Sequence, residues 1–239
     1  MAQRGPRWYF NFRSPYSWLA HHDLTARHPD VAGRVEWIPY WDPDPVSERL
    51  LAEAGGSFLY TPMSREKHFY VLTDVRRLAT DRGLAVSWPL DREPVWETAH
   101  LAWFLAADQG VGPAYTDLVY RARFQDGEDI NDPSLIAEIA GRLGLDPAAA
   151  GSAAEDPALR ERATAALMSA YRDGVFGPPF LIAGREKFWG LDRLDRFADA
   201  VRSAAATPAP APAPSAAPVP AAALSATPSG DLGHAGGCG

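Results

Sequence analysis

Residues 7–27 read RWYFNFRSPYSWLAHHDLTAR, and this stretch sets the fold class. The aromatic run at its start predicts a buried strand over residues 7–12. Ser14 and Pro15 follow as a helix N-cap and a favoured first helical residue, and the apolar pattern continues the helix through Arg27. Gly33 then breaks the chain, and residues 34–40 read as a second strand. The stretch therefore predicts a β-α-β unit.

The middle of the chain, from about residue 42 to residue 173, shows helical patterns and no convincing strand. Glycines suited to helix C-termini separate these patterns. The predicted helices cover residues 65–82, 93–107, 114–124, 133–143 and 157–173.

Strand patterns return near the end of the chain. Residues 180–183 and 186–189 predict two strands joined by a tight turn at Gly184 and Arg185, and residues 191–201 predict a final helix. The predicted order is thus β-α-β, a block of helices, then β-β-α. From residue 204 the sequence changes to Ala-Pro repeats and then to glycine-rich residues, a composition that predicts a disordered tail.

Composition narrows the class of protein. The formal charge of −7, without a basic stripe, argues against a nucleic-acid-binding protein. The sequence shows neither the apolar region of a signal peptide nor a membrane-spanning run. The single cysteine, Cys238, allows no intrachain disulfide, so we expect a cytoplasmic protein.

Two local motifs point to chemistry. Ser14 has an ordinary interpretation as a helix cap, but its hydroxyl also lies where a helix N-terminus favours an anion such as a thiolate. The pair Pro178-Pro179 precedes a strand and is explained either as a rigid loop or as a cis peptide that turns the backbone toward a ligand.

Metal chemistry finds little support. His21 and His22 have no partner at a recognised ligand spacing, and the acidic run over residues 126–132 lacks the final glutamate of a calcium loop. We expect no metal site. Most of the tryptophans are expected in the core, and some are expected to line an aromatic pocket.

The segments at residues 9–20, 174–180 and 188–194, taken with the element order, resemble 2-hydroxychromene-2-carboxylate isomerases and the related kappa-class glutathione transferases. The resemblance runs in order from about residue 7 to residue 201. It implies an α/β, thioredoxin-like fold of the DsbA superfamily with an inserted helical domain, and a homodimer. Residues 1–42 and 174–203 would form the thioredoxin-like part, residues 43–173 the insertion and residues 204–239 the tail.

The resemblance also implies a function. Ser14 stands where a redox relative has its attacking cysteine and would hold the thiolate of glutathione or another small thiol, as the catalytic residue. The reaction opens a cyclic hemiketal and exchanges cis for trans geometry in an aromatic enone substrate. The residues implied to bind the cofactor are Pro178, Pro179, Leu191, Asp192 and Lys67, and those implied to bind substrate are Tyr16, Trp41 and Tyr70.

Other functions remain open. Pro178 has no N–H to donate to a bound thiol peptide, which lowers the expected affinity by about 0.5–1.5 kcal/mol. A kappa-like transferase would leave sulfur in its product, and a non-catalytic binding protein would have lost the thiol. Disulfide exchange is disfavoured because serines occupy both positions of the dithiol, at Ser14 and Ser17.

Overall fold

Four short strands form one mixed sheet in the order β2-β1-β3-β4. The strands are β1 (Arg7–Phe10), β2 (Glu36–Pro39), β3 (Phe180–Ala183) and β4 (Glu186–Trp189). β1 runs parallel to β2 and antiparallel to β3, and β3 and β4 form an antiparallel hairpin. This computed structural model describes residues 4–59 and 63–206 of the chain.

The central strand β1 is buried along its whole length, with Trp8, Tyr9 and Phe10 inaccessible to solvent. It ends at Phe10, two residues before the predicted end. The reason is a turn at Asn11, whose carbonyl accepts the Ser14 N–H at 3.0 Å and whose side-chain oxygen accepts the Arg13 N–H at 2.7 Å. Asparagine side chains commonly close such turns on the backbone two residues ahead.

Ten helices accompany the sheet in the described residues. They are α1 (Pro15–Arg27), α2 (Pro29–Ala32), α3 (Pro45–Glu53), α4 (Arg65–Thr80), α5 (Glu97–Asp108), α6 (Gly112–Arg121), α7 (Pro133–Arg142), α8 (Pro147–Gly151), α9 (Pro157–Asp173) and α10 (Leu194–Ala206). A π-helical turn (Ala122–Asp126) follows α6, and short 3-10 turns precede α9 and α10. The predicted element order and the helical block between the strands are confirmed.

Several boundaries differ from the prediction. α3 and α8 were not predicted, although α3 begins with the N-cap Asp44 and Pro45, which is a recognisable start signal. The helix predicted from residue 93 begins at Glu97 instead, since Glu93 adopts a φ of 47° and precedes Pro94, which disfavours helical backbone before it. The predicted tail is wrong for residues 204–206, which continue α10, and residues 207–239 lie outside the described residues.

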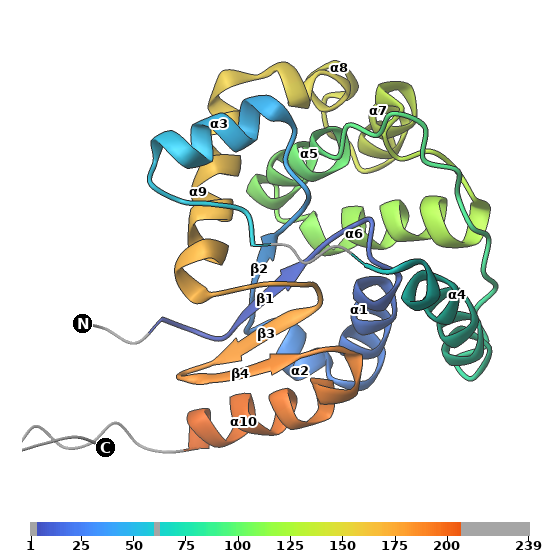
Figure 1. The fold of residues 1–239 in the computed structure, drawn as a ribbon, viewed down its shortest axis with the longest axis vertical. Coiled ribbons are helices and arrows are strands. Elements are labelled where there is room, and N and C mark those ends of the chain that lie inside the picture. Colours follow the sequence, from blue (N-terminus) through green and yellow to red (C-terminus); the bar gives the residue numbers. More distant parts are fainter. Residues whose placement is uncertain (1–3, 60–62, 207–239) are drawn as a thin grey trace, which may run out of the picture. The chain divides into compact units, whose positions relative to one another are not determined.

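The helices pack around the sheet (Figure 1). α10 contacts β3 and β4, and α9 contacts β2 and α3. α1 contacts α2, α4 and α10, so it joins α10, which packs on the sheet, to α4 of the insertion. One continuous hydrophobic core includes residues of the strands and of the insertion, and residues 4–59 and 63–206 cluster as one unit. The inserted helices therefore extend the core of the sheet.

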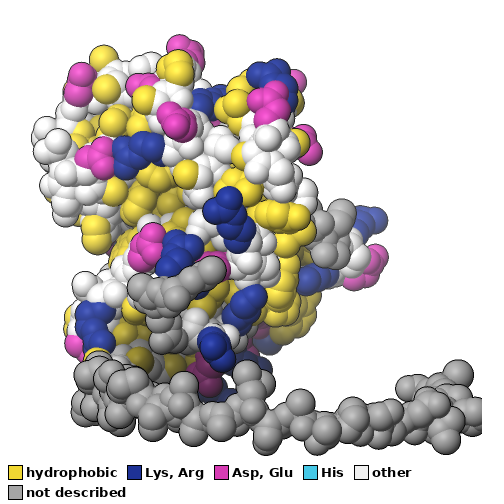
Figure 2. Space-filling model, turned by 90° about the vertical axis from the view of Figure 1, so that its left-hand side faces the viewer, with side chains coloured by type: hydrophobic (Ala, Val, Ile, Leu, Met, Phe, Trp, Pro, Cys, Tyr) yellow, Lys and Arg dark blue, Asp and Glu magenta, His cyan; other side chains and the backbone are white. Residues whose placement is uncertain are grey.

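A hollow of about 820 Å³ lies between α3 and α9, lined by Leu50, Met168 and small apolar residues with charged side chains at its rim. Hydrophobic side chains gather on the face that carries these helices (Figure 2). None of the helices that the structure describes has both the length and the apolar character needed to cross a bilayer.

Candidate functional site

Ser14 has the capping role that the sequence predicted for it. It is the N-cap of α1, and its Oγ accepts the Ser17 N–H at 3.2 Å. The hydroxyl hydrogen of the same group lies toward the carbonyl oxygen of Pro178, at a long Oγ–O distance of 3.5 Å. Since a hydroxyl can accept and donate at once, the capping bond leaves the Ser14 O–H available as a donor.

The backbone just before Ser14 is held by buried side chains of the insertion. The Phe12 N–H donates to Nε2 of His100 on α5 at 3.0 Å, and Tyr120 Oη on α6 donates to the Asn11 carbonyl at 3.2 Å. Nδ1 of His100 lies 2.6 Å from the Trp96 carbonyl. An acceptor role at Nε2 requires the hydrogen on Nδ1, so His100 is neutral and bonded at both nitrogens. Burial lowers the pKa of His100 to about 3.

A cleft of about 550 Å³ lies next to this turn, between α1, α4 and the start of α10. It brings together seven residues that the sequence had singled out: Tyr16, Lys67, Tyr70, Pro178, Pro179, Leu191 and Asp192. These residues are separated by as many as 176 positions in the chain. Ser14 adjoins the cleft through its contact with Pro178.

The Pro178-Pro179 segment forms one wall of the cleft. Its peptide bond is cis, as one of the two interpretations of this pair predicted for the bond itself. Trp189 stands beside it at the end of β4, with 52 % of its surface exposed and its ring 5.0 Å from that of Phe176. A Cβ on Gly177 would lie 3.3 Å from the Trp189 indole nitrogen, so the glycine leaves room for this ring. Trp189 is thus the tryptophan that lines the cleft.

The opposite wall is one face of α4. Lys67, Tyr70, Val71, Asp74 and Leu78 line the cleft at intervals of three or four residues, the spacing of one helical face. Asp74 is not among the residues predicted from the sequence, although its position four residues after Tyr70 places it on this face. Tyr16 of α1 donates its phenolic hydrogen to Asp74 at 2.8 Å, which joins the two helices.

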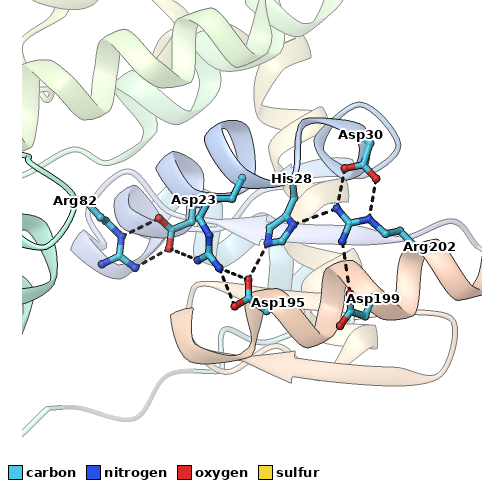
Figure 3. A network of polar contacts seen from close by, with 8 residues as sticks. Asp23, His28, Asp30, Arg82, Asp195, Asp199 and Arg202 are labelled. Carbon is cyan, nitrogen blue, oxygen red and sulfur yellow. Dashed lines mark hydrogen bonds and ion pairs between the residues drawn. The ribbon is translucent and has the colours of Figure 1, made fainter.

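A chain of charged residues connects α1 with the ends of α4 and α10 (Figure 3), and four of its members, Asp23, Arg27, Arg82 and Asp195, line the cleft. Arg82 makes two bonds of 2.8 and 2.6 Å to the buried carboxylate of Asp23, and Arg27 contacts both Asp23 and Asp195. None of these four residues is predicted as a site residue from the sequence. Their opposite charges are paired, so we assign them to holding α1, α4 and α10 together around the cleft.

His28 extends this chain to the end of α10. Its Nε2 lies 2.8 Å from Asp195, and its Nδ1 lies 3.2 Å from Nη2 of Arg202. Arginine can only donate, so Nδ1 accepts and the Nε2–H donates to Asp195. The hydrogen bond from His28, with the charge of Arg27, lowers the pKa of Asp195, which therefore remains an anion at neutral pH.

The structure places Trp41 away from the cleft, contrary to its predicted substrate contact. Trp41 is fully buried, its ring is stacked on His100 with centroids 5.2 Å apart, and its indole N–H donates to Glu97 at 3.0 Å. A side chain with no accessible surface cannot touch a substrate. Trp41 instead supports His100 from behind the turn at residues 11–14.

The described residues do not meet the requirements of a metal site. In residues 4–59 and 63–206, no group of three or more histidine, cysteine, aspartate or glutamate side chains is placed to hold a metal ion.

Comparisons with known proteins agree with the fold. The model of the DSBA-like thioredoxin domain matches residues 7–202. The 2-hydroxychromene-2-carboxylate isomerase of Sphingobium xenophagum is 31% identical over 191 residues, which are 78% of this chain and 92% of the relative. An isomerase of the same name from Pseudomonas sp. (strain C18) is 27% identical over 199 residues, 82% of this chain and 89% of the relative.

A solved structure of a 2-hydroxychromene-2-carboxylate isomerase superposes with a TM-score of 0.65 at 23% identity, covering 84% of this chain and 95% of that one. The inserted helical block is therefore part of a known arrangement. The α/β thioredoxin-like fold with a helical insertion, predicted from the sequence, is confirmed.

The buried His100 makes stability depend on pH. The unfolded histidine has a pKa near 6.5, whereas burial lowers the folded value to about 3, so the unfolded state binds more protons in this window. The contribution of neutral His100 to the free energy of unfolding is fully present above pH ~6.5 and falls as the pH drops toward 3. Between pH 7 and 5 the wild type should lose about 2 kcal/mol more than His100→Gln, measured by urea unfolding. Equal losses in the two proteins would contradict this assignment.

The Asp23–Arg82 pair should contribute to stability because Asp23 is only 3% exposed. Asp23→Asn leaves the arginine without its carboxylate and should lower the free energy of unfolding by about 3 kcal/mol. Asp108→Asn is the matched control, since Asp108 makes the same two-bond contact with Arg162 on an exposed surface, and its loss should be below about 1 kcal/mol. Similar losses of stability in the two variants would contradict the expectation that a buried ion pair contributes more than an exposed one.

Proposed function

The chain belongs to the DSBA-like thioredoxin domain family, and on that premise we propose that it is a thiol-dependent cis-trans isomerase of the 2-hydroxychromene-2-carboxylate isomerase type. The observation that carries the proposal is the cleft itself. It gathers seven of the residues implied by the sequence motifs, and Ser14 adjoins it at the N-terminus of α1.

Serine at both positions of the family's dithiol separates this chain from disulfide exchange. Ser14 caps α1, and Ser17 is fully buried with its hydroxyl 3.4 Å from the Asn11 N–H. Neither side chain can form a disulfide. A hydroxyl at a helix N-terminus can instead donate a hydrogen bond to an anion supplied by another molecule.

The cleft suits a small peptide thiol such as glutathione. Lys67 is exposed and presents a positive group to a ligand carboxylate. Asp192 is also exposed, and its carboxylate, one oxygen of which accepts from Arg193 at 2.6 Å, presents a negative group to a ligand ammonium. Pro178 and Leu191 supply apolar contact between them and the Ser14 end. When bound, the thiol would supply a nucleophilic sulfur that adds reversibly to a conjugated alkene, so that the bond can rotate.

The residues of the chain have separate tasks in this proposal. The Ser14 O–H donates to the sulfur and the N-terminus of α1 adds a favourable field, which together favour the thiolate. Each unit by which they lower the pKa of the thiol corresponds to about 1.4 kcal/mol. The rings of Tyr16, Tyr70 and Trp189 make the rest of the cleft suitable for a planar aromatic substrate.

Replacing Ser14 by Ala distinguishes the helix-capping role of its hydroxyl from a catalytic role. The lost capping bond should cost about 0.5–2 kcal/mol of stability. If the hydroxyl also holds a thiolate, folded Ser14→Ala should bind glutathione at least about tenfold more weakly by calorimetric titration and lose isomerase activity with hydroxychromene carboxylate. Ser152→Ala is a control because Ser152 lies outside the cleft. Full activity in folded Ser14→Ala would refute the catalytic role. Sulfur retained in the product would identify a transferase instead.

Pro178 offers a second test of glutathione as the thiol. Pro178→Ala restores a backbone N–H at the position implied to meet the cysteinyl backbone of the cofactor. One added hydrogen bond of about 0.5–1.5 kcal/mol should tighten glutathione binding roughly twofold to tenfold in the same titration. A thiol without a peptide backbone, such as mercaptoethanol, should show no such gain. Equal changes for both thiols would argue against this docking mode.

A further inference from the structure

Two phenol groups in the cleft share one carboxylate. Tyr16 Oη donates to Oδ2 of Asp74 at 2.8 Å, and Tyr70 Oη donates to Oδ1 of the same residue at 3.4 Å. Tyr16 comes from the first turn of α1, two residues after Ser14, whereas Tyr70 and Asp74 lie one turn apart on α4. All three line the cleft. The chain thus places an acid and two proton-carrying hydroxyls within one hydrogen-bonded unit.

Access to this unit differs among its members. Tyr70 is 58% exposed, whereas Tyr16 and Asp74 are partly buried. The charged groups around the carboxylate are Lys67 on the same face of α4 and Arg77, whose charge acts on Tyr16. The ion pair of Arg82 with Asp23 and the carboxylate of Asp195 lie farther along the cleft.

The Tyr16 phenol keeps its proton at neutral pH. Burial, and then the hydrogen bond to the Asp74 carboxylate, raise the pKa of Tyr16 well above its usual value. The hydroxyl hydrogen is used in the bond to Asp74, so the phenol oxygen presents its lone pairs to a ligand. Tyr16 can therefore accept a proton from a substrate hydroxyl as it passes its own proton to Asp74.

We propose that Asp74 is a positioning residue that couples Tyr16 and Tyr70 into a proton relay for opening a cyclic hemiketal. This inference rests on the proposed function and assigns its ring-opening step. In that step the hemiketal O–H proton moves to Tyr16 Oη, and the Tyr16 proton moves to Asp74. The C–O bond of the ring breaks, with its electron pair going to the ring oxygen. Tyr70 releases its long hydrogen bond to Oδ1 of Asp74, turns its O–H toward the ring oxygen and protonates it. The neutral Asp74 carboxyl group then rotates and returns to Tyr70 the proton that it took from Tyr16, so charge and atoms balance.

A hemiketal offers two neighbouring oxygens to a unit that has two phenol groups. The hydroxyl and the ring oxygen of a hemiketal are bonded to one carbon, and the two phenols are held by the two oxygens of one carboxylate. A proton taken at one position is thereby returned at the adjacent position without release to water. General acid–base assistance of this kind contributes about 10²–10⁴-fold to a rate.

The decisive comparison uses two substrates of the holoenzyme with glutathione. One is a cyclic hydroxychromene carboxylate, which must open. The other is an open-chain aryl enone acid that lacks the ortho hydroxyl and cannot cyclise. Asp74→Asn should lower kcat for the cyclic substrate about 100-fold and change kcat for the open one less than about threefold. Asp81→Asn is the control, because Asp81 is an exposed residue at the end of α4 outside the cleft.

A binding measurement gives a readout apart from turnover. A saturated cyclic analogue that keeps the hemiketal but lacks the ring double bond should bind Asp74→Asn about tenfold more weakly, and Tyr16→Phe likewise. Tyr70→Phe serves as a second activity variant because its exposed ring makes misfolding a minor concern. It should also slow only the cyclic substrate.

The outcomes distinguish failure of the proton relay from failure of the proposed isomerase function. Equal slowing of both substrates, or no slowing of either, would overturn the relay while leaving the isomerase intact. If the wild type turns over neither substrate and binds no thiol, the proposed function fails and the relay fails with it.

Discussion

The hydrogen bond from the Phe12 N–H to Nε2 of His100 connects the two parts of the molecule at the point where the chemistry is expected. His100 comes from α5 in the insertion, and Phe12 lies in the turn between β1 and α1. The bond lies in the core and is supported by the stacked ring of Trp41. Because the turn is held from the insertion side, Ser14 and the first turn of α1 occupy a defined position relative to α4. The cleft depends on that position.

Residues from the start to the end of α1 contribute to the cleft. Ser14 caps its start, and Tyr16, Asp23 and Arg27 line the cleft from one helical face. The first turn thus carries the groups suited to binding and proton transfer, whereas the last turns carry the ion pairs that hold α4 and α10. Variants that lose an ion pair should therefore be affected mainly in stability. Variants that lose a hydroxyl group should be affected mainly in turnover.

Much of this could be predicted because the signals are local. Ser14-Pro15 marks a helix start, and the motifs around Pro178 and Asp192 placed two more cleft segments. Asp23 has no local signal, because its partner Arg82 lies 59 residues away and meets it only where α1 approaches the end of α4. Asp74 lies four residues after Tyr70 on one helical face, but its shorter bond, to Tyr16, likewise forms only where α1 approaches α4. Trp41 was misassigned for the same reason, since its sequence neighbourhood does not reveal that Glu97 and His100 enclose it. The role of such side chains depends on partners that are distant in the sequence.

The central claim is that Ser14 and the N-terminus of α1 stabilise the thiolate of a bound small thiol. The most direct measurement is the ultraviolet absorbance of the thiolate of bound glutathione as a function of pH, in the wild type and in Ser14→Ala. We expect the bound thiol to ionise at a lower pH than free glutathione, and we expect the difference to shrink in the variant. Ionisation at the pH of the free thiol in the wild-type complex would contradict the claim.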